Sequence, residues 1–242
     1  MPLRDHLKEL RRRVTLIVIG LAIGTIAGWF FFTPAFEALQ EPVLAVASER
    51  GSTITLNFSG LATALDMRIK VALFLGLLIS SPWWLYQVWA FVSPGLKRHE
   101  RRYTVGFLAA AIPLFGAGVA LGWVVFPNAV RLLTEFVPDQ STSLLDAQLY
   151  LDFAMRVFLA FGIAFVFPVV MVLLTWGGAV RTRTWLKGWR WAVVVMFTFG
   201  AVMTPTPDVI TMFALAIPMC ALYFGAIGIG ALRKRNQGEK AS

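Results

Sequence analysis

Charged residues are scarce in this sequence: lysine, arginine, aspartate and glutamate make up 14% of the 242 residues, whereas hydrophobic residues make up 58%. About a quarter of the residues in a typical soluble domain are charged, so this composition excludes an ordinary water-soluble fold. Cysteine occurs once, at Cys220, which excludes an intramolecular disulfide. The thiol lies in an apolar run, where we expect it to face lipid or to pack in the core.

Histidine is also rare, with only His6 and His99 in the chain. His99 and Glu100 begin like the zinc motif H-E-x-x-H, but Tyr103 stands where the second histidine is needed. The chain has no nucleotide-binding loop of the form G-x-x-x-x-G-K-S/T. We therefore predict neither a metal site nor a cofactor.

The sequence also lacks the residues that catalysis or solute transport within the membrane usually requires. An intramembrane enzyme needs paired carboxylates or a nucleophile with its base, and the acids on the basic side of the chain are single residues in separate segments. A solute carrier usually has ionisable residues inside its spans, and the long apolar runs here contain none. We predict that the chain is not an enzyme. A small-solute secondary transporter is the main alternative function, followed by an intramembrane enzyme.

Six runs without a charged residue dominate the sequence. They cover residues 14–32, 71–92, 103–126, 157–180, 191–204 and 209–232. A transmembrane helix needs about 20 apolar residues, which every run except the fifth provides. The first run is too long for the h-region of a secretory signal peptide, so we expect it to be retained.

Prolines interrupt four of these runs and are expected to kink the helices, at Pro82, Pro113, Pro168 and Pro218. No linker or repeat divides the chain. The sequence therefore predicts an all-α fold in a single domain over residues 1–242. We expect a polytopic integral membrane protein with a kinked bundle of six transmembrane helices.

The basic residues lie mainly on one side of this arrangement. Seventeen of the 22 lysines and arginines fall before the first run, in the second-to-third and fourth-to-fifth connections, and after the sixth run. Basic residues near span ends are retained in the cytoplasm, so both termini are predicted to be cytoplasmic. Because the basic residues are divided among short segments between apolar runs, the net charge of +9 does not indicate a nucleic-acid partner.

Two acidic residues stand among cytoplasmic arginines. Glu9 precedes Arg11, Arg12 and Arg13, and Glu100 lies between Arg98 and Arg101 in the connection after the second run. At helical spacing Glu9 can pair with Arg12 or Arg13, which would be a purely structural role. The other interpretation is that the two carboxylates bind a cationic ligand at the membrane surface. Spacing alone leaves both interpretations open.

Several motifs in order along the whole chain resemble the TatC family. They are His6-Leu7-Lys8-Glu9-Leu10-Arg11-Arg12-Arg13, Tyr86 to Leu96, His99-Glu100-Arg101-Arg102, Phe161-Gly162 with Phe165 to Pro168, Thr204 to Asp208, and Ala216-Ile217-Pro218-Met219. The resemblance implies the signal-receptor subunit of the twin-arginine protein translocase, in the bacterial cytoplasmic membrane. It implies that twin-arginine signal peptides of folded preproteins bind at the cytoplasmic face and that the protonmotive force drives export.

The family's site residues can be carried over by motif. The resemblance implies that Glu9 and Glu100 bind the signal arginines, with Phe91 beside them. Secondary candidate positions are Gln87, Pro42 in an outer cap, and Asp208 at the outer mouth between the fifth and sixth spans. Many family members carry an acid in the fourth-span motif F-G-x-x-F-E-x-P, whereas this chain has Val166 there.

The short fifth run suggests where partners dock. The resemblance implies a hetero-oligomer that contains several TatC copies. Its other subunits would be single-span TatA and, where one exists, TatB. A run of 14 residues over 191–204 rises about 21 Å, against a hydrocarbon core of about 30 Å. We therefore expect local thinning of the lipid bilayer and docking of a short partner span at Val195, Phe199 and Met212.

The predicted topology can be tested with single cysteine reporters in intact cells. Reporters at Lys97, Lys187 and Lys240 should be shielded from an impermeant thiol reagent, because these positions belong to the basic segments. Reporters at Ser48 or Ser141 should react. Labelling at Lys97 from outside would overturn the six-span topology.

Overall fold

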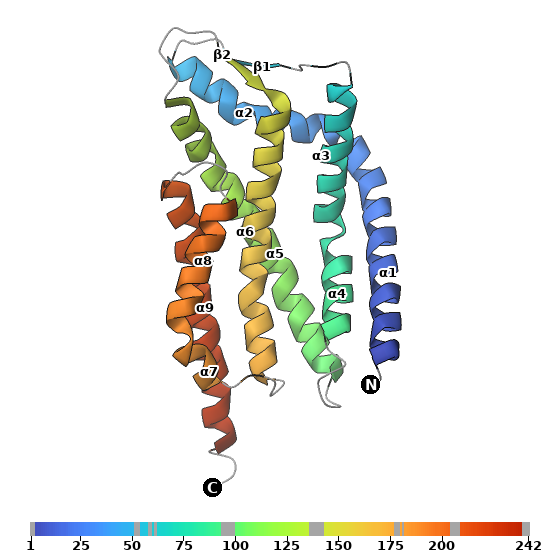
Figure 1. Cartoon of the computed structure of the whole chain (residues 1–242), viewed down its shortest axis with the longest axis vertical. Coiled ribbons are helices and arrows are strands. Elements are labelled where there is room, and N and C mark those ends of the chain that lie inside the picture. Colours follow the sequence, from blue (N-terminus) through green and yellow to red (C-terminus); the bar gives the residue numbers. More distant parts are fainter. Residues whose placement is uncertain are drawn as a thin grey trace. The chain divides into compact units, whose positions relative to one another are not determined.

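The computed structural model describes residues 3–50, 54–57, 60, 62–92, 100–135, 143–176, 180, 182–203 and 209–238. Figure 1 shows the helices α1 (Leu3–Phe30), α2 (Phe32–Arg50), α3 (Thr63–Ile79), α4 (Ser81–Val92), α5 (Glu100–Glu135), α6 (Ala147–Trp176), α7 (Thr182–Lys187), α8 (Trp189–Met203) and α9 (Val209–Gly238). The all-α prediction is confirmed. The sequence patterns did not predict the short parallel pair β1 (Ile54–Asn57) and β2 (Ser143–Asp146), in which Ile54 pairs with Ser143.

Membrane-spanning helices are present, as predicted. Among the described residues, the helices long and apolar enough to cross a membrane cover Arg4–Phe30, Val105–Arg131 and Ala147–Thr175. Two shorter apolar stretches cover Trp189–Val202 and Leu215–Gly228. The predicted run 71–92 is divided between α3 and α4. The count of six spans and the orientation of the termini stay predictions.

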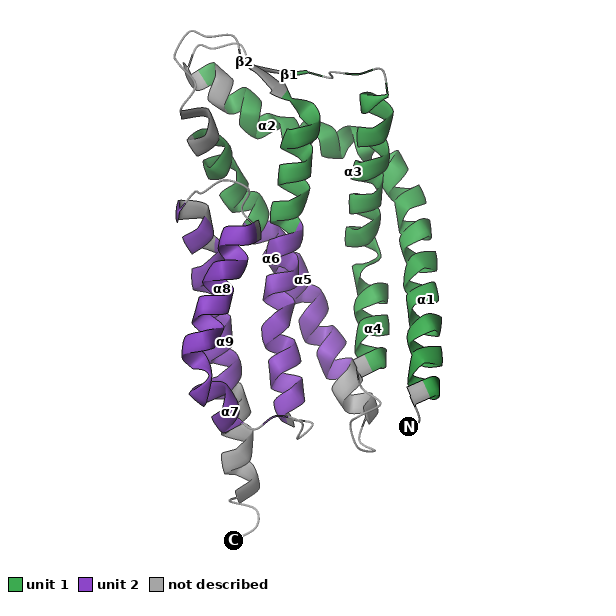
Figure 2. Cartoon of the chain, viewed as in Figure 1, with its two compact units in different colours: residues 1–91, 122–158 green, residues 92–121, 159–242 purple. Residues whose placement is uncertain are grey.

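The chain divides into two compact units, shown in Figure 2. Unit 1 contains residues 1–91 and 122–158, and unit 2 contains residues 92–121 and 159–242. Helices α5 and α6 run without a break through both units. Because two helices belong to both units, this division does not test the prediction of a single domain.

In unit 1, α1 packs closely against α3 through glycines. A Cβ atom on Gly24 would lie 2.5 Å from the carbonyl oxygen of Gly76, and one on Gly28 would lie 2.5 Å from that of Ala72. Only glycine permits such an approach of two helix backbones, and small residues spaced by four are typical of membrane helix pairs. The contact fixes α1 beside the α3–α4 segment.

The α3–α4 segment is broken at Ser80. The N–H of Ser80 donates to the carbonyl of Gly76 at 2.9 Å and ends α3. Pro82 follows in the first turn of α4, where its missing N–H removes no helical hydrogen bond. The kink predicted at Pro82 is thus a complete break between two helices. Trp83 then joins α4 to α1, because its indole Nε1 donates to the carbonyl of Leu16 at 2.8 Å.

Helix α2 is held at the other end of unit 1 by buried contacts. Leu39 and Val43 are buried, and the hydroxyl of Tyr150 on α6 donates to the carbonyl of Leu39 at 2.6 Å. Helix α2 continues through Pro42, which is buried. The buried contacts on either side of Pro42 account for the continuation.

An ion-pair group joins α3 to α6 near α2. The Lys70 Nζ atom lies 3.1 Å from Asp66 and 3.5 Å from Asp152. The hydrogen bond with Asp66 is the main cause that raises the pKa of Lys70. Asp146 caps α6, since its Oδ1 accepts the N–H of Gln148 at 2.8 Å. These bonds fix the N-terminal end of α6 against α3.

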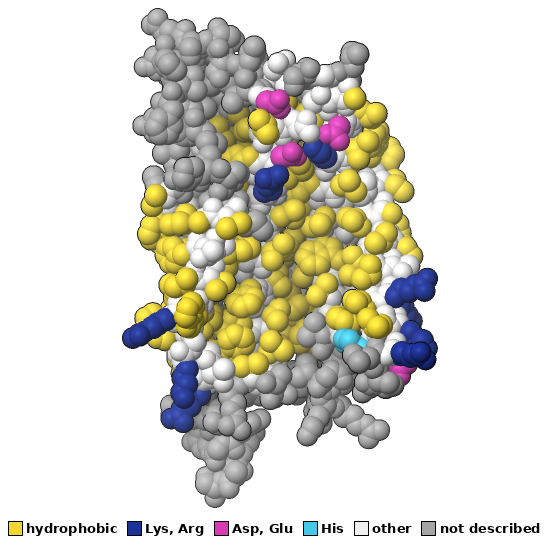
Figure 3. Space-filling model, in the orientation of Figure 1, with side chains coloured by type: hydrophobic (Ala, Val, Ile, Leu, Met, Phe, Trp, Pro, Cys, Tyr) yellow, Lys and Arg dark blue, Asp and Glu magenta, His cyan; other side chains and the backbone are white. Residues whose placement is uncertain are grey.

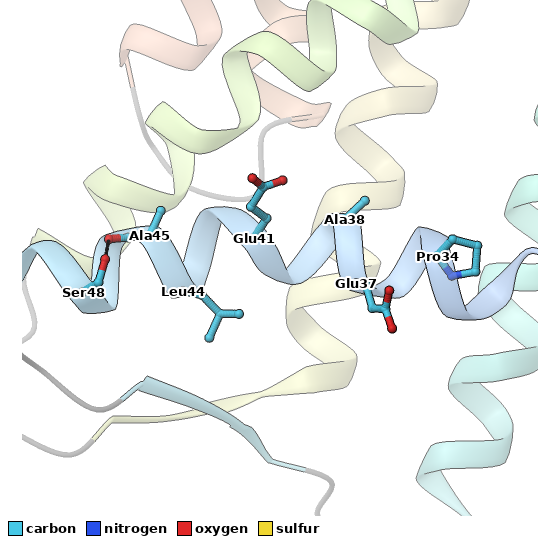
Figure 4. A pocket seen from close by; sticks show the side chains of 7 residues that line it. All are labelled: Pro34, Glu37, Ala38, Glu41, Leu44, Ala45 and Ser48. Atoms are coloured by element: carbon cyan, nitrogen blue, oxygen red, sulfur yellow. Dashed lines mark hydrogen bonds between the residues drawn. The ribbon is translucent and has the colours of Figure 1, made fainter.

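The open side of α2 carries acid. Figure 4 shows a shallow hollow along this helix, with the carboxylates of Glu37 and Glu41 at its surface. Both side chains are exposed. An acidic hollow is compatible with the outer cap that the family resemblance implies for this segment, because basic residues are the ones retained in the cytoplasm.

Large apolar side chains cover the surface of the helices, as Figure 3 shows for one face. On α1, Val18, Ile23, Ile26 and Phe30 are each more than half exposed. Such a surface is unfavourable in water but is the usual surface of a helix in lipid. In unit 1, one group of basic side chains in Figure 3 lies near the N-terminal end of α1, and other basic side chains lie among acidic ones in the upper part of the view.

Unit 2 is built on a second close helix contact. A Cβ atom on Gly118 of α5 would collide with the carbonyl oxygen of Phe161 on α6, and one on Gly162 would lie 2.7 Å from the Phe115 ring. Helices α8 and α9 pack through Phe197 and Phe213, whose ring centroids lie 5.3 Å apart.

The single thiol, Cys220, lies within this helix pair. It is half-buried, and its Sγ is 3.7 Å from Sδ of Met196. This position matches the predicted packing role. Tyr223 extends the contact to α7 by donating its hydroxyl to the carbonyl of Trp185 at 2.8 Å.

Two neighbouring glycines of α5 test the close contact between α5 and α6. Gly118→Ala should lower the melting temperature of the purified protein, because overpacking costs about 1–3 kcal/mol. Gly116→Ala is the matched control, since a Cβ there meets nothing within 4 Å. That change should be neutral or stabilising, because alanine is the better helix former. Equal melting temperatures for the two variants would contradict the close contact.

Candidate functional site

Two helix ends in unit 1 bring polar and aromatic residues together. His6, Glu9 and Arg13 lie on one face at the start of α1, and Gln87 and Phe91 lie on one face at the end of α4. We call these five residues the N-terminal cluster. The glycine contact between α1 and α3, and the Trp83 hydrogen bond between α4 and α1, hold the two faces together.

Arg13 is the centre of the cluster. Its Nε donates to Oε1 of Glu9 at 2.6 Å, and its Nη1 donates to Oε1 of Gln87 at 2.8 Å. Glu9 and Arg13 are four residues apart, the spacing at which helix neighbours pair best. The planar guanidinium is therefore fixed at two points, one on each helix.

The burial of these side chains increases from Glu9 to Gln87. The exposed fractions of the side chains are 30% for Glu9 and 20% for Arg13, whereas Gln87 is only 1% exposed. A buried amide without a partner would cost about 1–3 kcal/mol, so the bond from Arg13 satisfies a group that has little access to solvent. Arg13 also uses only one carboxylate oxygen of Glu9, which leaves Oε2 for a ligand.

An aromatic pair borders the polar groups. The rings of His6 and Phe91 have centroids 4.7 Å apart, with planes inclined by 29°. His6 is exposed and Phe91 is half-exposed, so the stack is accessible at the surface. The pair places an aromatic face beside a carboxylate, a combination suited to a guanidinium or ammonium group.

Exposed cations surround the cluster on α1. Arg4, Lys8, Arg11 and Arg12 are all exposed. A cationic ligand therefore meets a mainly positive field at long range and the Glu9 carboxylate at short range, with the exposed Asp5 one turn away on α1. Binding must be specific and short-ranged, because surface charges beyond about 10 Å are screened at ordinary salt.

The structure places the other predicted site residues as follows. Glu100 is the first residue of α5, and its side chain lies outside the described residues, as does all of Asp208. Pro42 is buried in α2 of unit 1. Val166, which replaces the fourth-span acid, is buried in unit 2.

Of the three predicted docking residues, Val195 and Phe199 lie on α8 and Met212 lies on α9. Val195 and Phe199 line an apolar groove of about 490 Å³ in unit 2, which we call the α6–α8 groove. Met212 instead packs against Gly200 of α8, with its carbonyl oxygen 3.3 Å from a Cβ built on that glycine. In the part of the chain that the structure describes, no group of three His, Cys, Asp or Glu residues could hold a metal ion.

Sequence reasoning considered the Glu9–Arg13 pair but not its link to Gln87. A signal for that link was present, because Gln87 is the only amide in the run 71–92. An amide in an apolar helix needs a partner within the protein. His6 was recognised only as part of a motif, and its stacking on Phe91 depends on a contact between distant segments.

Comparison with known proteins gives consistent matches over the chain. The family model described as Sec-independent protein translocase protein (TatC) matches residues 5–218. The protein of that name from Xylanimonas cellulosilytica is 50% identical over 242 residues, covering 100% of this chain and 88% of that protein. The one from Aquifex aeolicus is 35% identical over 246 residues and covers 100% of both.

A solved structure matches the fold as well. A crystal structure of the twin-arginine translocase receptor TatC in DDM aligns with a TM-score of 0.80 and 32% identity, over 93% of this chain and 99% of that chain. All five residues of the N-terminal cluster lie within the range that the family model matches.

Proposed function

The chain belongs to the TatC family of Sec-independent protein translocase components, and we propose that it is the receptor subunit that binds twin-arginine signal peptides of folded preproteins. The family is a transport family, which agrees with the prediction that the chain is not an enzyme. Membership of this family also identifies the chain, a multi-pass membrane protein, as part of a protein translocase. The alternative function of a small-solute carrier is therefore not supported. The observation that carries the proposal is the bonding of Glu9 and Gln87 to one guanidinium in the N-terminal cluster.

A signal arginine would meet Glu9 at its free oxygen. Arg13 holds Oε1 at 2.6 Å, so the carboxylate is oriented before the ligand arrives. The incoming guanidinium then donates to Oε2, and the two cations share one carboxylate. With one oxygen open, arginine is still favoured over lysine, because a planar guanidinium is more weakly hydrated than an ammonium group and can lie flat beside the guanidinium of Arg13.

One carboxylate is not enough for tight binding. A hydrogen bond between charged groups contributes about 1.5–3 kcal/mol, and partial exposure of Glu9 reduces this. A dissociation constant of 1 μM corresponds to about 8 kcal/mol. We therefore assign the second signal arginine to Glu100 and apolar signal residues to the Phe91 surface.

The proposed location and partners follow from the family and the basic segments. We place the chain in the bacterial cytoplasmic membrane with the N-terminal cluster at the cytoplasmic face, where a preprotein signal arrives. TatA, and TatB where present, are the proposed single-span partners in a hetero-oligomer with several copies of this chain. Coupling to the protonmotive force belongs to the same proposal.

Glutamine substitutions test signal binding. Glu9→Gln and Glu100→Gln should each weaken binding of a twin-arginine peptide about tenfold or more, the equivalent of about 1.4 kcal/mol. Gln87→Leu should lower both affinity and melting temperature, because Nη1 of Arg13 loses its acceptor, whereas Gln87→Glu retains one. Titration of a labelled peptide against the protein in nanodiscs measures the affinities.

Glu41→Gln, on the open side of α2, is the control for this titration and should bind the peptide normally. Unchanged affinity in the double Glu9→Gln, Glu100→Gln variant would assign both carboxylates a structural role only.

Partner docking is tested at the short helix α8. Its 15 residues rise about 22 Å, less than the hydrocarbon thickness of about 30 Å. A photocrosslinker at Val195, which is 62% exposed, should capture a single-span partner in membranes, while one at the buried Leu215 of α9 should not. Inserting four leucines after Val195 should reduce the capture. Equal capture by the lengthened helix would exclude a role for the mismatch.

A further inference from the structure

The α6–α8 groove is a mostly apolar groove on the surface of unit 2. Its walls come from Ile163 and Phe167 of α6, from one face of α7 and α8 that includes Val195 and Phe199, and from Tyr223 of α9. Ile163, Phe167 and Val195 are exposed, so the groove opens at the surface of the helices. In a membrane this surface faces lipid.

The polar atoms around the α7 end of the groove are bonded within the protein. The Trp185 indole donates to the Thr175 hydroxyl at 3.1 Å, and its carbonyl accepts the Tyr223 hydroxyl at 2.8 Å. These bonds leave the apolar faces of the two rings toward the groove. The described lining is therefore mostly apolar, with Thr184 as its hydroxyl residue besides Tyr223, and suits a hydrocarbon chain.

Three exposed cations border the groove. Arg183, Lys187 and Arg190 each directly precede a lining residue, namely Thr184, Gly188 and Trp191. Helical hydrogen bonds continue across the junction of α7 and α8, from Gly188 N–H to Thr184 and from Ala192 N–H to Gly188, both at 3.0 Å. Successive residues of a helix are turned by about 100°, so the three cations share the helix face next to the lining residues, and their long side chains can extend toward the edge of the groove.

Tryptophans at the same end indicate the depth of the groove in the bilayer. Trp191 is 76% exposed and lines the mouth, and the exposed Trp189 lies beside it, with the guanidinium of Arg190 5.7 Å from its ring centroid. Exposed tryptophans with arginine typically mark the headgroup level. From Gly188 to Phe199 the groove follows α8 for about 16 Å toward the hydrocarbon core.

We propose that the α6–α8 groove binds an anionic phospholipid, with its headgroup on Arg183, Lys187 and Arg190 and one acyl chain along the apolar wall toward Phe199. The groove volume of about 490 Å³ is smaller than the roughly 1,250 Å³ of a helix about 10 Å wide over the same 16 Å, so a partner helix can lie across the mouth of the groove but not inside it. A single hydrocarbon chain is much narrower, and the three cations select a negative headgroup.

This lipid site does not depend on signal recognition, but it bears on partner docking. A partner span that uses Val195 and Phe199 must displace the acyl chain or lie across it. The bound lipid would then be a competitor for the partner, and its release would accompany assembly.

The test uses the full chain alone, in nanodiscs of phosphatidylcholine with a trace of photoactivatable phosphatidylglycerol. The label should map by mass spectrometry to peptides of α8 and α6 that line the groove. Added phosphatidylglycerol should compete with it, whereas added phosphatidylcholine should not. Equal competition by the two lipids would overturn the proposal.

Variants separate the two parts of the site. Lys187→Gln should reduce groove labelling roughly fivefold, the effect of one basic side chain at an anionic surface, and the triple glutamine variant of the three cations should reduce it further. Arg156→Gln, which removes an exposed cation of unit 1, is the control and should label normally. Ala192→Phe should block the groove and abolish labelling. Unchanged labelling in the triple variant would overturn the proposal. If a variant fails to fold, the lipid competition measured on the unmodified chain still tests the proposal.

Discussion

The guanidinium of Arg13 joins the two helix ends on which the proposed receptor site is built. It bonds to Glu9 on α1 and to the buried amide of Gln87 on α4, at 2.6 and 2.8 Å. Hydrocarbon supplies no hydrogen bonds, so a polar group inside a membrane helix must find its partner within the protein. The position of Gln87 therefore determines where the start of α1 can lie, and with it the orientation of the Glu9 carboxylate.

Close backbone packing makes this short-range chemistry possible. Gly24 and Gly28 let α1 approach α3 to a distance that a single added Cβ would prevent. The break at Ser80 then sets α4 as a separate helix, and Trp83 ties it back to Leu16 on α1. Two separate contacts therefore hold the site in place. One is the backbone packing of α1 on α3, and the other is the hydrogen bond from the Trp83 indole to the carbonyl of Leu16.

Much of this architecture follows from local sequence and could be predicted. Runs without charge predicted the helices because lipid excludes charge, and the spacing of Glu9 and Arg13 is local to one helix. The break at Ser80 was not predicted, since Pro82 indicated only a kink. Pairing of Ile54 with Ser143, stacking of His6 on Phe91 and the bond to Gln87 all join distant segments, which periodicity within one segment cannot show. The groove beside α8 likewise depends on α6, α7, α8 and α9 meeting.

The central claim is that Glu9, oriented by Arg13, recognises an arginine of the signal peptide. The most direct measurement is a double-mutant cycle in nanodiscs, in which twin-arginine and twin-lysine forms of one signal peptide are titrated against the unmodified chain and Glu9→Gln. The unmodified chain should bind the arginine peptide about tenfold or more tightly than the lysine peptide, and Glu9→Gln should lose most of this preference. The same preference in both proteins would contradict the central claim, because Glu9 would then have no part in reading the arginines.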